Sequence, residues 1–208
     1  MRFLSRLAIL LVACACASSL RATTVEPMEF SELVNASDYI VRGRVKELRN
    51  EVRQQAGREL PFTLVEVEVL EVVAGTPPAR VTLSLVGGRT PDGGELRVEG
   101  VPQFTVGDEE IFFVQGNGTN FYPTTAVMHG RYPVLFDKQL NRSYVARINR
   151  VPLAATAEIG LPLAEGKLAQ LLRRQRRADD ALTPAEFTAS IRQARTDKKT
   201  SPEVTRAR

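Results

Sequence analysis

The chain has 208 residues, of which 43% are hydrophobic and 25% charged, the composition of an ordinary globular domain. Its only histidine is His129, and both cysteines, Cys14 and Cys16, lie within the first twenty residues, so the rest of the chain cannot use a Cys nucleophile, a Cys/His zinc site or an internal disulfide. Three of the positive charges behind the net +4 lie in residues 1–22, which leaves +1 for the remainder and gives no support for nucleic-acid binding.

Residues 1–22 have the pattern of a secretory signal peptide. Two arginines precede an apolar run of small and aliphatic residues at 7–17. This run of about 11 residues is well short of the ~20 that a membrane-spanning helix needs. Small residues at Ala17 and Ala22 suit a signal peptidase, so we expect cleavage near one of them. The expected product is periplasmic or secreted and has no transmembrane segment.

Cys14 offers an alternative interpretation of the same segment. The tetrapeptide Leu11-Val12-Ala13-Cys14 resembles the lipobox of bacterial lipoproteins, in which the Cys is lipidated and becomes the new N-terminus. Lipidation of Cys14 would tether the protein to a membrane. Both interpretations predict export, and they differ in whether the exported protein is free or lipid-anchored.

The segments after the signal peptide alternate apolar and polar residues in the manner of half-buried strands. Apolar positions 30, 33 and 34 predict a short helix first. Turn formers then separate the apolar runs, and a hairpin tip is expected at 116–120. Strands at such short intervals favour a sandwich or small barrel over alternating strands and helices. The expected strands are residues 39–48, 62–73, 81–86, 95–98, 111–114, 124–128, 132–136 and 143–148.

Three of these strands carry further detail. Gly43 lies in mid-strand, which predicts a bulge or the close approach of another backbone. A loop at residues 54–60 leads into the run at 62–73, which exceeds the usual strand length of about 5 to 6 residues and is expected to bend or bulge near Leu70. The run at 111–114 is wholly apolar, so we expect both of its faces to be covered in the core.

The chain changes character after Val151. Residues 163–177 predict a helix that carries Leu168, Leu171 and Leu172 on one face. A second helix is expected from the string Thr183-Pro184-Ala185-Glu186, which combines a capping box with proline at the first helical position.

These elements define the expected domain organisation. The fold class is mainly β: a small open antiparallel β-barrel at residues 23–155 with a short N-terminal helix. Two C-terminal helices form an extension at residues 156–195. Residues 196–208 are polar and charged without apolar periodicity, which predicts a disordered tail.

Four arginines end the helix predicted at 163–177: Arg173, Arg174, Arg176 and Arg177. Cations at this end of a helix interact favourably with its dipole. As a local basic cluster they are candidates for contact with a polyanion or an anionic envelope surface. The alternative is a solvated helix end, since no aromatic residues are interleaved to stack on bases.

His129 and the carboxylates are the remaining candidates for chemistry. No second His or Cys is near His129 in the sequence, so a metal site would need Asp and Glu ligands alone. Glu66 and Glu68 share a strand face, but polar pairs on strands are common. Asp108-Glu109-Glu110 are adjacent and lack the spacing of a calcium loop, so we expect them on the solvated surface. We predict no catalytic residue, no metal and no cofactor.

Four segments within residues 29–150, taken in order, form a motif. They are Glu32-Leu33-Val34, Asp38-Tyr39-Ile40-Val41-Arg42-Gly43-Arg44-Val45, Val65-Glu66-Val67-Glu68-Val69-Leu70-Glu71-Val72-Val73-Ala74-Gly75, and Gly100-Val101-Pro102-Gln103-Phe104 with Val106-Gly107-Asp108-Glu109. In this order they resemble a family of uncharacterised bacterial exported β-rich proteins. That family has an Asp-x-Ile-Val-x-Gly-x-Val strand and a Gly-x-Pro-x-Phe-x-x-Gly-Glu turn, from which Asp108 is a mild departure.

The resemblance implies a topology similar to OB-fold barrels and to netrin or metalloprotease-inhibitor-like modules. Inhibitors of that group chelate the protease metal through an N-terminal Cys, and no Cys follows the predicted signal peptide here, so their mechanism is not carried over. The family supplies no catalytic residue either.

The sequence therefore predicts an exported, non-enzymatic binding or accessory module of the bacterial envelope or extracellular space. Its partner is an unidentified protein or envelope polymer, and we expect a monomer. Two alternatives remain open. One is a metal-dependent hydrolase built from carboxylates and His129, and the other is attachment to anionic envelope surfaces through the basic C-terminal helix.

Overall fold

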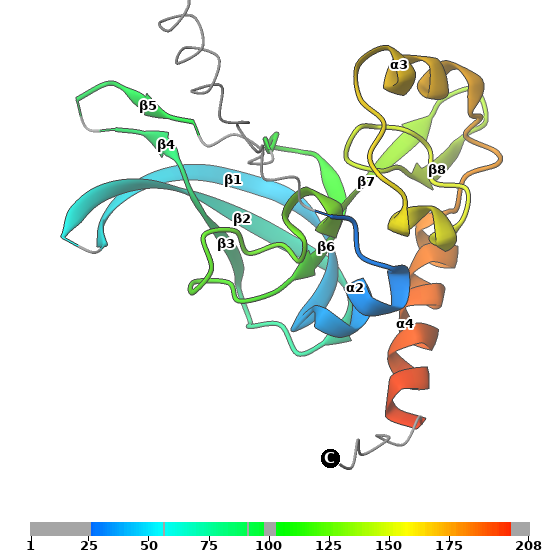
Figure 1. Cartoon of the computed structure of the whole chain (residues 1–208), viewed down its shortest axis with the longest axis horizontal. Coiled ribbons are helices and arrows are strands. Elements are labelled where there is room, and N and C mark those ends of the chain that lie inside the picture. Colours follow the sequence, from blue (N-terminus) through cyan, green and yellow to red (C-terminus); the bar gives the residue numbers. More distant parts are fainter. Residues whose placement is uncertain (1–25, 56, 91, 98–102, 201–208) are drawn as a thin grey trace, which may run out of the picture.

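The fold was analysed in a computed structural model that describes residues 26–55, 57–90, 92–97 and 103–200. It is mainly β, and its main sheet has six antiparallel strands in the order β3-β2-β1-β6-β7-β8 (Figure 1). This sheet is open, and a small second sheet pairs β4 with β5. The strands are β1 (Tyr39–Gln55), β2 (Arg58–Gly75), β3 (Val81–Val86), β4 (Gly88–Arg89), β5 (Glu95–Leu96), β6 (Glu109–Val114), β7 (Arg131–Asp137) and β8 (Arg142–Val145).

One short N-terminal helix and two C-terminal helices accompany the sheet, which confirms the expected fold class. They are α2 (Phe30–Ala36), α3 (Gly166–Gln175) and α4 (Pro184–Thr200), with 3-10 turns η1 (Val127–Gly130) and η2 (Thr156–Gly160). Helix α4 continues past the boundary expected at 195, because the polar residues that follow extend its backbone hydrogen bonding. The rest of the expected tail, residues 201–208, lies outside the described residues.

Strands β1 and β2 form one long hairpin. The loop expected at residues 54–60 is shorter, because Gln54 pairs with Glu59 and a hydrogen bond of 3.0 Å joins their side chains. The bulge expected near Leu70 is confirmed: Arg42 pairs with Glu71 and Gly43 with Val69, which leaves Leu70 as the extra residue.

The close backbone approach expected at Gly43 is also confirmed. A Cβ atom at this position would lie 2.9 Å from the carbonyl oxygen of Glu68. A side chain here would push β1 and β2 apart, so glycine is required where the two strands bend together.

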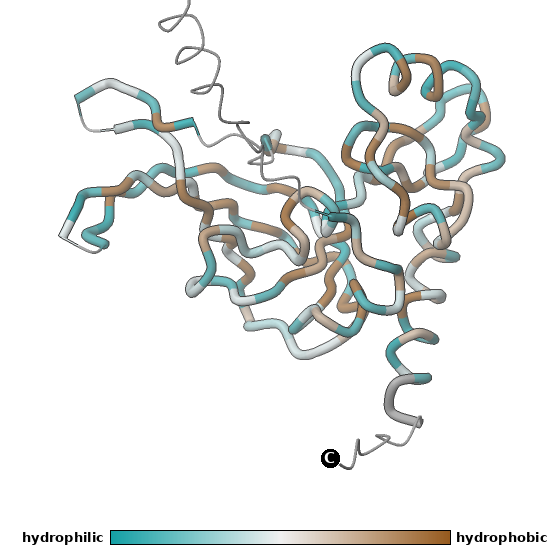
Figure 2. Tube along the Cα trace, viewed as in Figure 1, coloured by the Kyte–Doolittle hydropathy of each residue, from teal (hydrophilic) through white to brown (hydrophobic). Residues whose placement is uncertain are grey.

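Strand β6 has a hydrophobic core on each of its faces, as its apolar sequence predicts. Ile111 and Phe113 belong to a first core that α2, η2 and α4 cover. Phe112 and Val114 belong to a second core between β6 and the hairpin-forming strands β1, β2 and β3. The tube in Figure 2 shows the hydrophobic stretches gathered along these central strands.

Helices α2 and α4 pack against each other on the first core. Phe187 of α4 is fully buried there, with its ring centroid 5.0 Å from that of Tyr132. The predicted capping box is present: the Thr183 backbone N–H donates to Glu186 at 2.8 Å, and the Glu186 N–H donates to the Thr183 hydroxyl at 3.2 Å. Arg195 donates to the carbonyl of Val34 at 2.7 Å, which satisfies an orphan group at the end of α2.

The strand expected at residues 124–128 does not form. Thr124 makes a single bridge with Val114, and the chain then turns into η1. Ala126 and Val127 have φ angles of 50° and 53°. These left-handed conformations are incompatible with a strand, so the apolar run is used in a turn instead.

The loop after β6 covers the outer edge of β3. The side-chain amide of Asn117 donates to the Thr82 carbonyl at 2.8 Å, and its oxygen accepts from the Ser84 backbone N–H at 3.1 Å. Asn117 therefore replaces a neighbouring strand and protects this edge from pairing with another chain. It lies in the turn predicted at residues 116–120.

Candidate functional site

Two rows of side chains across β1, β2 and β3 form the floor of an open groove. The strand register sets them side by side, since each residue is paired with its neighbour on the next strand. One row continues the second core to the surface, and the other is mostly polar. The rows are Leu48, Val65 and Leu83, and Asn50, Thr63 and Leu85; Val65 and Leu83 are fully buried, and the other four line the groove.

The β4–β5 hairpin, here called the arm, forms one wall of the groove. The Thr63 hydroxyl donates to the Gly87 carbonyl at 2.9 Å, and the Arg89 N–H donates to the Asn50 side-chain oxygen at 3.3 Å. Gly88 has a φ of +128°, and a Cβ atom there would lie 2.4 Å from that Asn50 oxygen. Glycine at 88 therefore allows the arm to sit on the sheet.

Phe104 and Gln103 form the opposite wall, and a buried ion pair holds them. The Arg131 guanidinium lies 3.6 Å from the Phe104 ring centroid and donates to the Gln103 carbonyl at 3.2 Å. Its other nitrogens donate to the two carboxylate oxygens of Glu110 at 2.6 and 2.7 Å. Burial raises the pKa of Glu110, while the charge and hydrogen bonds of Arg131 act in the opposite direction.

This ion pair corrects the expectation that Asp108-Glu109-Glu110 are all solvated. Glu110 is 2% exposed, because strand β6 directs it toward Arg131. Glu109 accepts from Arg42 at 2.7 Å on the outer surface of the sheet. Asp108 lies at the surface too, 3.8 Å from the Arg150 guanidinium, so Glu110 is the one of the three that is buried.

The groove has a volume of about 220 Å³, a floor of apolar and polar side chains, and a charged rim. Leu48, Leu85 and Phe104 line its apolar part. On the rim, Arg97 is 3.1 Å from the Glu95 carboxylate. Within the part of the chain that the structure describes, the guanidinium of Arg89 has no ion-pair partner, so it presents a free positive charge beside the groove.

The four arginines predicted as a polyanion contact all lie at the C-terminal end of α3, but their surroundings differ. Arg176 forms an ion pair with Glu158, and Arg177 donates to Asp179 at 2.9 and 2.7 Å. Arg173 donates to the neutral Asn149 carbonyl at 3.1 Å. Arg174 is exposed and makes no hydrogen bond or ion pair with the described residues. Two of the four charges are therefore compensated by carboxylates.

The leucines predicted on one face of α3 are not buried in the core. The residue that α3 buries is Ala169, whereas Leu168 and Leu171 are 55% and 49% exposed. Across the described ranges, none of the helices is both long enough and apolar enough to cross a membrane. Cys14, the candidate lipidation site, lies outside the described residues.

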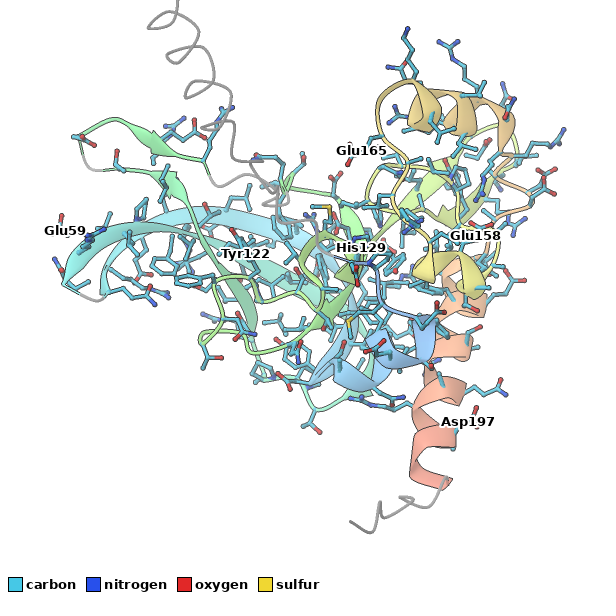
Figure 3. The ribbon with its side chains drawn as sticks, in the orientation of Figure 1. Glu59, Tyr122, His129, Glu158, Glu165 and Asp197 are labelled. Carbon is cyan, nitrogen blue, oxygen red and sulfur yellow. The ribbon has the colours of Figure 1, made fainter. Side chains whose placement is uncertain are left out.

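His129 is buried in η1, where its backbone N–H donates to the Ala126 carbonyl at 3.0 Å. Figure 3 shows the labelled carboxylates Glu59, Glu165 and Asp197 spread over the molecule, away from His129. Among residues 26–55, 57–90, 92–97 and 103–200, no three His, Cys, Asp or Glu side chains gather in the manner of a metal site.

The other candidate carboxylates, Glu66 and Glu68, have a structural setting on β2. Glu66 is 3.8 Å from the Lys46 ammonium and 4.0 Å from the Arg49 guanidinium. Glu68 is exposed and pairs with Arg44 across the hairpin. The two therefore lie in a cross-strand charge pattern on the surface.

Comparison of the chain with protein-family models, with curated proteins and with solved structures finds no match, so the fold and the groove have to be interpreted from their own geometry.

Proposed function

We propose that this protein is a non-catalytic binding module that holds an extended segment of a partner protein in the groove between the β1–β3 floor and the arm. The observation that supports this proposal is the groove over the second core, in which Leu48 is 36% exposed beside the buried Leu85, with polar groups on the rim. The signal peptide expected at residues 1–22 places the encounter outside the cytoplasm.

The size of the groove favours a polypeptide over a cofactor. Sites for small molecules usually enclose roughly 300–1,000 Å³. The groove offers about 220 Å³ and is open along one side, which suits one or two apolar side chains of a longer segment. The rest of the bound segment would lie outside the hollow.

The backbone of β1 offers the second element of recognition. Strand β6 pairs with β1 from Tyr39 to Arg44, and Val45 exchanges backbone hydrogen bonds with Gly107 and Asp108 just before β6 begins. Beyond Val45, β1 is paired with β2 alone among the described residues. At Leu48 and Asn50, β1 is therefore the edge strand beside the groove. An extended segment can add to such an edge through main-chain hydrogen bonds while a pocket selects its side chains.

Charge on the rim of the groove indicates which side chains the bound segment carries. Arg89 lies on the arm without an ion-pair partner among the described residues, whereas Arg97 is paired with Glu95. A carboxylate in the partner would form a charge-assisted hydrogen bond with Arg89. The proposed ligand is thus an extended segment that combines an apolar side chain with an acidic one.

Selection of short random peptides on the purified, exported chain tests this proposal. We expect enriched peptides to share apolar and acidic residues and to bind about tenfold more weakly to Leu48→Glu, since central apolar contacts dominate such interfaces. Val52→Glu is the matched control, because Val52 lies on the same strand and is 37% exposed, against 36% for Leu48, but does not line the groove.

A second pair of variants tests the role of the arm. Gly88→Ala and Gly93→Ala both place a side chain at a positive φ, of +128° and +86°, but only the first meets the sheet. We expect Gly88→Ala to weaken peptide binding and Gly93→Ala to leave it unchanged. Failure to enrich any peptide, or equal binding to the Leu48→Glu and wild-type chains, would overturn the proposal.

A further inference from the structure

Helix α3 presents an outward face on which leucines and cations are mixed. Successive helical residues are rotated by about 100°, so positions 167, 171 and 174 lie within about 40° of the direction opposite the buried Ala169, and Leu168 lies about 80° from that direction. Leu168 and Leu171 are 55% and 49% exposed on this face, and Lys167 and Arg174 lie beside them.

The net charge of this face is positive. Lys167 and Arg174 form no ion pair with the described residues, whereas Arg173 is turned toward the body of the protein, where it donates to the Asn149 carbonyl. Arg176 and Arg177 contribute little, because Glu158 and Asp179 compensate them. Figure 3 shows nitrogen-tipped side chains projecting from α3 away from the sheet.

We propose that the face formed by Lys167, Leu168, Leu171 and Arg174 docks on the surface of an anionic lipid bilayer. A water-soluble polyanion would pair with the two cations and leave both leucines in water. The bilayer interface accepts both kinds of group, because leucines enter the boundary between headgroups and acyl chains while cations contact anionic headgroups. The combination therefore favours a lipid surface.

The docking face is independent of the groove. Figure 1 shows α3 at one end of the molecule and the arm with the tip of the β1–β2 hairpin at the other. A bilayer beneath α3 would leave the groove open to a partner. The two proposals use no residue in common, so either one can fail without the other.

Vesicle cosedimentation with the exported full chain tests the docking face. We expect binding to phosphatidylcholine vesicles that contain about 30% phosphatidylglycerol, and much weaker binding to phosphatidylcholine alone. The loss of one cation near an anionic surface corresponds to about fivefold in affinity, so Lys167→Gln with Arg174→Gln should weaken binding about 25-fold.

Two matched controls separate this face from nonspecific attraction. Arg58→Gln with Arg80→Gln removes the same charge from exposed positions elsewhere, and it should leave vesicle binding within about twofold. Leu168→Gln with Leu171→Gln should reduce binding about tenfold, whereas Leu70→Gln with Val72→Gln, exposed by 42% and 49%, should not.

The chain contains no tryptophan, so a single one can report insertion directly. We expect the fluorescence of Leu168→Trp to shift to shorter wavelength with phosphatidylglycerol vesicles, and that of Phe121→Trp, at an exposed position on another loop, to stay unchanged. Absence of binding to anionic vesicles would overturn the proposal. Vesicle binding by the Leu168→Gln/Leu171→Gln variant that equals that of the wild type would also overturn it. That result would assign the face to soluble polyanions, for which dextran sulfate is the probe. Leu48→Glu in the groove should bind vesicles like the wild type.

Discussion

Glu110 and Arg131 show how one buried ion pair supports a surface site. Their side chains are 3% and 1% exposed. The guanidinium also donates a hydrogen bond to the Gln103 carbonyl and lies over the Phe104 ring. Each charge is desolvated and depends on the other for compensation. The wall of the groove is therefore linked to the interior through a contact that the sequence does not reveal, because Arg131 follows Glu110 by 21 positions.

Removal of one charge from this pair should lower the stability of the protein strongly, whereas removal of both should lower it only slightly. We expect Glu110→Ala to lower the free energy of unfolding by about 3–5 kcal/mol, since it leaves the Arg131 charge buried and unpaired. The double variant Glu110→Leu/Arg131→Met should recover most of that loss. Denaturant titration measures both values, and a double variant as unstable as the single one would contradict this account of the pair.

At the scale of elements, some local signals in the sequence were reliable, although the apolar run at 124–128 forms a turn and not the expected strand. Contacts between elements were not predictable. The Leu70 bulge and the Thr183/Glu186 capping box were predictable, because strand length and cap chemistry act over a few residues. The exposed leucines of α3 were not, because periodicity identifies a face without showing what covers it. The strand expected at 95–98 forms as β5 at Glu95–Leu96, but the contacts of the arm with Thr63 and Asn50 were not predictable, because they join residues far apart in the sequence.

The capping box of α4 should make stability depend on pH. Hydrogen bonds from the Thr183 backbone and hydroxyl lower the pKa of Glu186 below its usual value of 4.5. A carboxylate with a lowered pKa in the folded state stabilises the protein above the unfolded pKa and loses that contribution as the pH falls through the folded one. Glu186→Ala should therefore cost about 1 kcal/mol at pH 7 and less at about pH 3.

Thermal unfolding followed by circular dichroism at the two pH values measures this difference. Glu186→Gln keeps an acceptor for the Thr183 donors without a titrating group, so its stability difference from Glu186→Ala should be nearly independent of pH. A wild-type advantage over Glu186→Ala that stays constant with pH would exclude the charge as its origin.

At the scale of the whole molecule, the C-terminal helices and the sheet share one core. The extension expected at residues 156–195 includes Ile159, Phe187 and Ile191, all of which lie in the first core with Phe113 of β6. Helix α4 is thus part of the body of the fold, although it follows the last strand, β8, which ends at Val145.

Truncation of the chain after residue 160 should consequently abolish cooperative folding. Loss of a buried Phe or Ile side chain typically costs about 2–5 kcal/mol, and truncation removes both Phe187 and Ile191, against a total stability of about 5–15 kcal/mol. Rapid proteolysis and the absence of a thermal transition in the truncated chain are the expected observations. A sharp transition would show that the sheet folds without α4.

The packing of α2 against α4 also constrains the order of events during biogenesis. Helix α2, which begins at Phe30, packs against α4, which begins at Pro184, and Tyr39 pairs with Val114. The contacts that close the fold therefore have a large sequence separation. Such a topology folds slowly, because loop-closure entropy is lost before the distant contacts form. A nascent chain that emerges N-terminus first has no α4 to cover α2 until its last helix is synthesised, so the first core cannot close before nearly the whole chain has been made.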